Sequence, residues 1–407
     1  MPSIPCSERR NNKMNTLLAK NVNWVGYVDW YVRDFHSYDT KRGSTYNAYL
    51  VQGTDKTAVI DAVKAPYVDK LIANVLAITT ADRVDYLVCN HAEPDHSGGF
   101  PALVKAFPDA EVVCNAKCKD ALSHHYETGA WKFKIVADGE QLALGGKTLQ
   151  FADTPMVHWP ESMAEFLIED GILFSMDIFG QHYASSARFD DETDFAEVMQ
   201  EAKIYYANIV LLYARPVETA LAKLGGLPIK MLAPSHGIIW RSRIPEILSA
   251  YQAWRVSKPV DKIVIFFASM WGSTKIMAEA IAEGVKESDV KFKLIDLGST
   301  SDTELVTELM DCAGFAAGTP TLNMNLLPRM AAALTYVRGL RPAGKFGFAF
   351  GSYGWGSKGA EEAAKYLADM QVEQIVPPVT TRFRPDTAML EKCRELGREL
   401  ARRAAAV

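Results

Sequence analysis

The sequence predicts an α/β protein with two domains, a layered αββα sandwich followed by an open, doubly wound parallel sheet. The chain of 407 residues is longer than one hydrophobic core usually organises, which favours two domains. From Trp24 to about Ser257, short strand-like runs alternate with helical stretches. After Lys258-Pro259, longer apolar runs alternate regularly with helices, as in a parallel sheet that is buried on both faces.

The composition excludes several classes of protein. Hydrophobic residues make up 48% of the chain and charged residues 23%, which is typical of a globular protein. The formal net charge of -5 offers no excess of positive charge for phosphates, so no nucleic-acid partner is expected. No apolar run approaches the roughly 18 residues of a membrane span. The six cysteines form no C-x-x-C pair and suit a reducing compartment, so we expect a cytoplasmic protein with no membrane partner.

Changes of pattern divide the chain into three segments. Residues 1–13 are polar and lack periodicity, which predicts a flexible N-terminal extension. We expect the first domain to cover residues 14–257 and the second to cover residues 258–407.

Turn residues bound a series of strand-like runs in the first domain. We expect Gly145-Gly146 to form a hairpin turn between two strands, while the order of strands in the sheets stays open. The expected strands are 46–51, 58–62, 84–90, 111–115, 132–136, 148–152 and 172–176, and helices are expected near 67–78 and after Gly99.

The second domain shows regular βαβ alternation, which predicts about five parallel strands. Its first strand is a nearly unbroken apolar run that leads through a polar loop into a helix. The expected strands are 262–268, 292–297, 314–317 and 346–350, and helices are expected at 276–285 and 387–403.

The sharpest motif is the hexapeptide His91-Ala92-Glu93-Pro94-Asp95-His96, which follows a predicted strand. Four potential metal ligands within six residues are rarely accidental on a loop. A strand end fixes the first ligand and a turn directs the others, so that they can face two neighbouring ions. We therefore expect a metal site at this loop.

Three further ligand-type side chains, His158, Asp177 and His236, also stand at predicted strand ends. Each by itself is more typical of a structural histidine or a helix cap. Together with the hexapeptide they make four imidazoles and three carboxylates without a thiolate, which favours hard, redox-capable ions over structural zinc. Two divalent ions can share seven such ligands if one carboxylate bridges them and open positions remain for a small molecule.

Three loops at strand ends in the second domain predict a flavin site. The loop 269–274 lies between a buried strand and a helix, where hydroxyls, N–H groups and the helix dipole hold a single phosphate such as that of FMN. Two more loops follow later strands on the edge where such sheets bind ligands. The candidate residues are Ser269, Met270, Trp271, Gly272, Ser273 and Thr274, then Pro320, Thr321, Leu322 and Asn323, and finally Ser352, Tyr353, Gly354, Trp355 and Gly356.

The ligand spacing resembles that of proteins with the metallo-β-lactamase fold. Hydrolases of that fold usually have a second histidine at the position of Glu93. A glutamate there resembles the pattern of the flavodiiron protein family. An anionic oxygen donor stabilises ferric iron, whereas a three-histidine site mainly generates metal-bound hydroxide. The resemblance extends from about Val22 to the C-terminus and includes the runs 43–49, 179–181 and 205–208. It implies one iron bound by His91, Glu93 and His158, a second iron bound by Asp95, His96 and His236, and a bridging Asp177.

The second domain resembles flavodoxin. This resemblance implies that loop 269–274 holds the FMN phosphate and that Thr321, Asn323, Tyr353, Gly354 and Trp355 surround the ring. No cysteine-rich rubredoxin module follows in the sequence, so an external electron donor such as rubredoxin is expected. The family also implies a head-to-tail homodimer, or a dimer of dimers.

The resemblance implies an oxidoreductase that reduces dioxygen to water, nitric oxide to nitrous oxide, or both, with two irons and FMN as cofactors. Tyr205, Tyr206, His182 and Trp355 are candidates for donors beside the metal ligands or for channel walls. The alternatives are a dinuclear metal hydrolase fused to a flavodoxin-like module, a non-catalytic electron carrier, and an oxidase that takes hydride from a reduced deazaflavin. The sequence does not rank the two gases, because neither carries a recognisable group.

Overall fold

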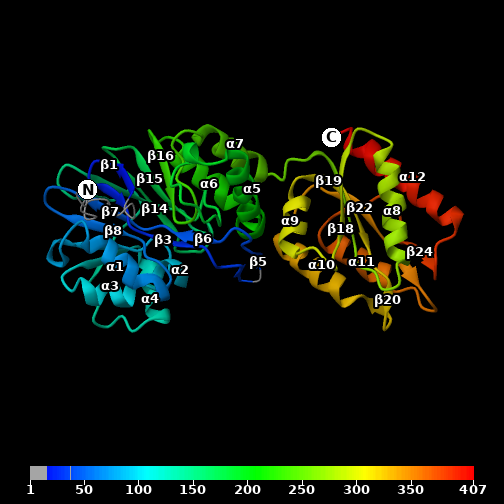
Figure 1. The fold of residues 1–407 in the computed structure, drawn as a ribbon, viewed down its shortest axis with the longest axis horizontal. Helices are drawn as coiled ribbons and strands as arrows, with labels where there is room; N and C mark the ends of the chain where they lie inside the picture. The colour runs from blue at the N-terminus through cyan, green and yellow to red at the C-terminus, as the bar shows by residue number, and fades with distance from the viewer. Residues whose placement is uncertain (1–15, 37) are drawn as a thin grey trace, which may run out of the picture. The chain divides into compact units, whose positions relative to one another are not determined.

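The computed structural model describes residues 16–36 and 38–407, so the extension expected at residues 1–13 lies outside the described residues. The chain forms two compact units (Figure 1). The first takes in residues 16–33, Thr40–Ala202 and Arg215–Ile247. The second takes in Asp34–Asp39, Lys203–Ala214 and Leu248–Val407. Within the described residues, every helix is too short or too polar to span a membrane.

Two sheets form the centre of the first unit. Apolar side chains from both sheets meet in one core, to which Tyr49, Val88, Phe151 and Phe174 contribute. Helices lie outside the sheets, which is the expected αββα arrangement (Figure 1). The first sheet has the order β1 (Thr16–Ala19), β2 (Val22–Trp24), β7 (Tyr49–Gln52), β8 (Thr57–Ile60), β9 (Tyr86–Val88), β10 (Glu111–Cys114) and β11 (Phe133–Ile135).

The second sheet of this unit is mainly antiparallel. Its first two strands form the hairpin expected at Gly145-Gly146, and only its last pair of strands is parallel. Its order is β12 (Gln141–Ala143), β13 (Thr148–Asp153), β14 (Met163–Leu167), β15 (Ile172–Met176) and β16 (Met231–Pro234). The helices of this part of the chain are α1 (Val68–Leu76), α2 (Pro94–Ser97), α3 (Phe100–Ala106), α4 (Ala116–His125), α5 (Phe195–Tyr205), α6 (Ala214–Leu224) and α7 (Ile244–Trp254).

The sequence pattern missed strand β14. All five of its residues are buried, so apolar and polar positions do not alternate along it. Glu165 stands in its middle and is wholly buried, which no simple apolar pattern anticipates. Its neighbours in the sheet, rather than its own residues, therefore define this strand.

The second unit contains one parallel sheet with helices on both faces, as expected of a doubly wound fold. The apolar run after Lys258-Pro259 forms its central strand, and the chain then adds strands on either side of it. The order is β18 (Lys291–Asp296), β17 (Val260–Phe267), β19 (Cys312–Gly318), β22 (Phe346–Tyr353) and β23 (Glu373–Gln374), and β24 (Val379–Arg382) also pairs with β22. The helices are α8 (Ser273–Lys286), α9 (Asp302–Met310), α10 (Pro328–Leu340), α11 (Gly359–Asp369) and α12 (Thr387–Ala404).

Small strand pairs complete the fold. They are β3 (Tyr27–Asp29) with β6 (Ser44–Tyr46), β4 (Asp34–Phe35) with β5 (Tyr38–Asp39), and β20 (Thr321–Leu322) with β21 (Asn325–Leu326).

The second unit includes three stretches that precede residue 258, where the sequence places the boundary between domains: Asp34–Asp39, Lys203–Ala214 and residues 248–257. Asn208 donates a hydrogen bond to the carbonyl of Thr303 over 3.3 Å and accepts one from the hydroxyl of Tyr336 over 2.9 Å. Lys203 pairs with Asp311 at 2.6 Å. These contacts join residues about a hundred positions apart, so a change of pattern along the chain cannot reveal them.

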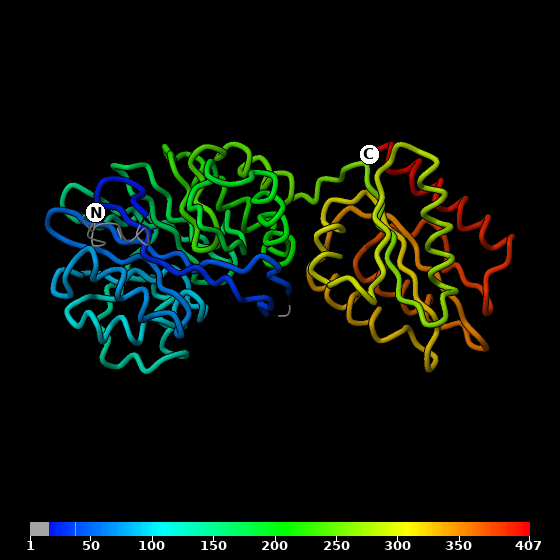
Figure 2. Tube along the Cα trace, in the orientation of Figure 1, coloured from blue at the N-terminus to red at the C-terminus, as the bar shows by residue number. Residues whose placement is uncertain are grey.

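Helices α8 and α12 lie side by side on the sheet of the second unit, as Figure 2 shows. Two glycines allow the close approach. A Cβ atom on Gly397 would stand 2.1 Å from the carbonyl oxygen of Ile281, and one on Gly284 would stand 2.0 Å from that of Arg394. Both obstacles are backbone atoms, which cannot rotate away.

We therefore predict that Gly397→Ala lowers the free energy of unfolding by about 1–3 kcal/mol, because an added methyl group would push the two helices apart. Gly339→Ala in α10 is the matched control, since a Cβ there meets nothing within 4 Å. This control should be neutral or raise the free energy of unfolding by about 0.5–1 kcal/mol through helix propensity. Urea unfolding of both variants checks the prediction, and equal effects would contradict it.

Candidate metal centre and flavin pocket

Loops and helix starts that follow strand ends bring the seven candidate ligands together in the first unit. The chain turns after β9 through His91, and Pro94 starts the short helix α2, whose first position suits proline because its missing N–H would be unpaired there. Asp177 follows β15 directly, and His236 follows β16. Six of the seven are less than a tenth exposed, and His158 is partly exposed.

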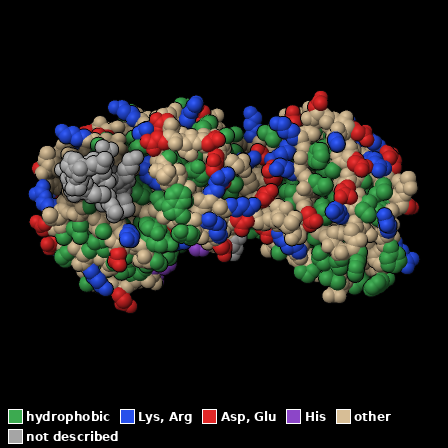
Figure 3. Space-filling model, in the orientation of Figure 1, with side chains coloured by type: hydrophobic (Ala, Val, Ile, Leu, Met, Phe, Trp, Pro, Cys, Tyr) green, Lys and Arg blue, Asp and Glu red, His purple; other side chains and the backbone are tan. Residues whose placement is uncertain are grey.

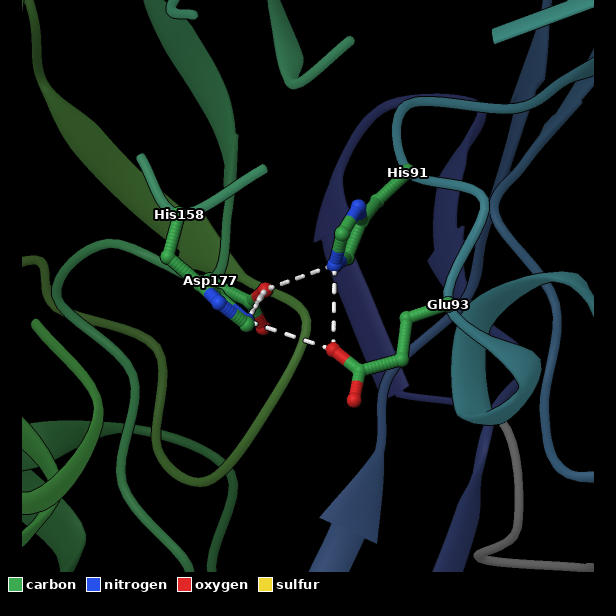
Figure 4. Close-up of side chains that lie close together, drawn as sticks. All are labelled: His91, Glu93, His158 and Asp177. Carbon is green, nitrogen blue, oxygen red and sulfur yellow. Dashed lines mark hydrogen bonds and ion pairs between the residues drawn. The ribbon is translucent and has the colours of Figure 1, made fainter. Parts of the chain in front are cut away.

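The first group of ligand atoms consists of His91, Glu93, His158 and Asp177, which all point toward one another in Figure 4. Glu93 Oε2 lies 3.1 Å from His91 Nε2 and 3.2 Å from His158 Nε2. Asp177 Oδ2 lies 3.6 Å and 3.3 Å from the same two nitrogens. One atom from each of these four residues lies within 4.8 Å of the others, so a single ion can contact all four.

The second group consists of Asp95, His96 and His236. Asp95 Oδ2 lies 3.2 Å from His236 Nε2 and 3.7 Å from His96 Nε2. Asp177 faces this group as well, because its other oxygen, Oδ1, lies 3.2 Å from His96 Nε2 and 3.5 Å from His236 Nε2. Asp177 thus presents one oxygen to each group, which is the geometry of a bridging carboxylate.

Opposite charges overcome the effect of burial in both groups. Burial raises the pKa of Glu93, but hydrogen bonds from His158 and His91 outweigh it and lower that pKa to about 2. Burial lowers the pKa of His158, yet Asp177 and Glu93 together raise that pKa to about 10. In the same way, interactions with Asp95 and Asp177 raise the pKa of His96 well above its usual value despite burial. The three carboxylates therefore strongly attract positive charge.

This donor set fits two hard metal ions. Among the described residues, both groups consist of imidazole nitrogens and carboxylate oxygens without a cysteine sulfur, as suits iron. Asp95 Oδ1 is buried and has no hydrogen-bond partner among the described residues. Such an atom is costly in a protein interior unless a cation or a donor compensates it.

Residues outside the predicted set of site residues hold the ligands in place. His91 Nδ1 donates a hydrogen bond to Glu161 Oε1 over 2.8 Å, and His236 Nδ1 donates one to the carbonyl of Thr45 over 2.7 Å. Glu161 stands three residues after the candidate ligand His158, so its carboxylate within a predicted metal-site loop was the available signal.

The residues expected beside the ligands have different surroundings. His182 is buried, bonds through Nδ1 to the hydroxyl of Ser44 over 2.7 Å, and has its ring 5.0 Å from that of His236. Burial lowers the pKa of His182 well below its usual value, so this ring is neutral. Tyr205 and Tyr206 belong to the second unit, where Tyr206 packs against Tyr251.

The second unit carries a pocket of about 590 Å³ at the ends of its strands. All three predicted loops contribute to it. In Figure 3, hydrophobic side chains gather at the end of this unit that carries β20. The lining residues are Met270, Trp271, Ser273, Pro320, Thr321, Asn323, Met324, Ser352, Tyr353, Gly354, Trp355, Gly356, Phe383 and Arg384.

Four predicted flavin residues lie outside this lining, and three of them shape the first loop. Ser269 Oγ accepts a hydrogen bond from the N–H of Gly272 over 3.1 Å. Thr274 is buried and bonds to the hydroxyl of Ser352 over 3.1 Å. Leu322 lies in β20. The lining also contains Met324, Phe383 and Arg384, which the loop motifs did not predict because these residues lie beyond them.

Known protein families match both halves of the chain. The model of the ODP family beta lactamase matches residues 45–237, and that of flavodoxin matches residues 265–397. The chain is 39% identical to the nitric oxide reductase of Moorella thermoacetica over 95% of this chain and 98% of that protein.

Two solved structures resemble the chain along nearly their whole length. The flavodiiron protein from Giardia intestinalis has a TM-score of 0.94 and 35% identity over 96% of this chain and 97% of its own. The rubredoxin oxygen:oxidoreductase from Desulfovibrio gigas has a TM-score of 0.93 and 35% identity over 96% of this chain and 99% of its own. Together with the two family matches, these similarities place the chain in the flavodiiron protein family.

Metal binding should release protons. The pKa of His158 is raised to about 10, so this imidazole is protonated at pH 7 in the metal-free protein, whereas a metal ligand must be neutral. The affinity for ferrous iron should therefore rise as the pH is raised, until the pH approaches the pKa of His158. Anaerobic calorimetry in buffers of different ionisation enthalpy measures the released protons, and His158→Ala should release fewer. Binding without proton release in the wild-type protein would contradict this.

Retention of FMN should depend on the backbone at Gly272. Gly272 is the residue before the first turn of α8 and has a φ of +84°. A Cβ added there would meet nothing within 4 Å, so only the backbone conformation restricts which residue can replace this glycine. Gly272→Val should weaken FMN retention about tenfold or more, because a β-branched residue disfavours positive φ. Gly272→Asn should retain more FMN, because asparagine tolerates this conformation. Flavin absorbance after dialysis checks both variants, and equal loss in the two would argue against the prediction.

Proposed function

We propose that this chain is a flavodiiron oxidoreductase that reduces dioxygen to water, nitric oxide to nitrous oxide, or both, at a non-haem diiron site. The observation that carries the proposal is Asp177, whose two carboxylate oxygens face two separate groups of nitrogen and oxygen donors. A flavin pocket in the same chain supports redox chemistry rather than hydrolysis.

The residues divide into two sets of ligands around Asp177. His91, Glu93 and His158 would hold the first iron, and Asp95, His96 and His236 the second. When bound, iron would supply a binding position for the gas and two electrons, and FMN would supply two more for the reduction of dioxygen. Glu93 adds negative charge where a dizinc hydrolase has an imidazole, which favours ferric iron.

Burial of the ligands suits a very small substrate. The side chains of His158 and Glu93 are 15% and 11% exposed, while those of His91, Asp177 and His236 are at most 2% exposed. A gas molecule can therefore reach the site from the side of His158 and Glu93. A larger ester or lactone would need a wider opening, so the hydrolase alternative is not favoured.

The flavin pocket is accessible to an external electron donor. Trp271 and Trp355 at its edge are 93% and 90% exposed, which leaves the pocket open to a redox protein. The name of the Desulfovibrio gigas relative points to rubredoxin as such a donor. A reduced deazaflavin remains the second candidate donor. The head-to-tail homodimer and the cytoplasmic location stay predictions, and sedimentation of an active monomer would count against the dimer.

Anaerobic stopped-flow of the reduced, iron-loaded protein against each gas tests the proposed reactions. Rapid reoxidation by at least one gas, with about two irons and one FMN per chain, supports the proposal. Zinc in place of iron together with esterase turnover would instead select the hydrolase.

We predict that Glu93→Ala and Asp177→Ala lose most of their iron and gas reduction while retaining FMN, because the ligands and the flavin pocket belong to different compact units. Metal analysis, flavin absorbance and an oxygen electrode give the three measurements. Asp109→Ala, at a largely exposed carboxylate, should behave as the wild type. Full dioxygen consumption by Asp177→Ala would show that the assigned role is wrong.

A further inference from the structure

Glu161 contacts both the ring and the backbone of the loop that carries the first ligands. Its Oε1 accepts a hydrogen bond from His91 Nδ1 over 2.8 Å and another from the N–H of Ala92 over 3.1 Å. His91 is wholly buried and Glu161 is 3% exposed, so water cannot easily replace either bond. The carboxylate therefore holds the ligand ring from the side opposite the metal group.

We propose that Glu161 is a positioning residue that directs His91 Nε2 at the first iron and, through its negative charge, makes this imidazole a stronger electron donor than His236 is to the second iron. The proposal rests on the proposed diiron function. It makes the two iron positions electronically unequal: the first should bind its ion more tightly and should be harder to reduce.

The direction of His91 follows from the two hydrogen bonds. A carboxylate can only accept, so the proton of the neutral ring resides on Nδ1 and Nε2 presents its lone pair. Nε2 is the atom that lies 3.1 Å from Glu93 and 3.6 Å from Asp177. The ring stands nearly perpendicular to that of Trp159, with the centroids 4.9 Å apart, and this contact limits rotation of the imidazole.

The two groups of ligands differ in the partner of one Nδ1 atom each. His91 donates to a carboxylate, whereas His236 donates to the neutral carbonyl of Thr45 over 2.7 Å. A negatively charged acceptor draws the proton from the ring and raises the basicity of the opposite nitrogen more than a carbonyl does. The negative charge of Glu161 therefore increases electron donation from His91 to the first iron position.

The surroundings keep Glu161 in place. The side chain of Asn115 caps α4 by accepting from the N–H of Cys118, and its NH₂ group donates to the backbone carbonyl of Glu161 over 2.8 Å. The start of α4 and the loop before β14 are thereby joined beside the ligand loop. Glu161 thus belongs to a fixed framework.

Two substitutions in the full-length holoprotein separate charge from positioning. Glu161→Gln keeps an oxygen that can accept from both His91 and Ala92 but removes the charge. This variant should retain two irons, and the midpoint potential of its metal centre should be higher than in the wild type. A redox titration that monitors the electron paramagnetic resonance signal of the mixed-valent state measures this potential. Glu161→Ala removes both functions and should weaken iron binding about 10–100-fold, measured by competition with a chelator.

Glu165→Gln is the control for replacing a buried glutamate by glutamine, since within the described part of the chain this side chain bonds to Asn90 and to none of the seven candidate ligands. It should leave the potential and the iron affinity unchanged. An unchanged potential in Glu161→Gln, or an equal shift in Glu165→Gln, would overturn the proposal, as would normal iron affinity in Glu161→Ala. Failure of the wild-type protein to bind iron would instead refute the proposed function itself.

Discussion

The attraction between three buried carboxylates and four imidazoles is the interaction on which the first unit depends. Each of these groups would be costly to bury alone, and their mutual pairing, together with the metal ions that they suit, offsets that cost. Asp177 is central because both of its oxygens are engaged, one by each group. The loops that carry the ligands must therefore stay in register to within a fraction of an ångström, although they come from both sheets.

A second layer of buried polar side chains maintains this register. Asp61 accepts from the N–H of Asn90 over 2.9 Å and from the hydroxyl of Ser235 over 3.1 Å, and so joins the residues that precede His91 and His236. Glu161 performs the same task from the other side of His91. Carboxylates thus have two roles in this fold. Some are ligands for cations, and others accept hydrogen bonds that hold the loops and the imidazole rings in place.

The two compact units handle different parts of one redox reaction by different physical means. The first concentrates charge in a nearly closed site, which suits strongly bound ions and a small gas. The second offers hydroxyls, backbone N–H groups and exposed aromatic rings around an open pocket, which suits a flavin that exchanges electrons with a partner. Both halves occur in one chain, which is the combination that the two family matches describe.

The sequence by itself determined the fold class, the seven candidate ligands and most of the flavin pocket, because strand ends, turn residues and ligand spacing are local features. Tertiary structure alone decided which residues hold those ligands, as Glu161 with His91 and Thr45 with His236 show. Tertiary structure also decided that the residues around Glu165 form a strand, and that Asn208 bonds to Thr303 in the second unit. These features depend on contacts between distant parts of the chain, and such contacts leave no periodic trace in the order of the residues.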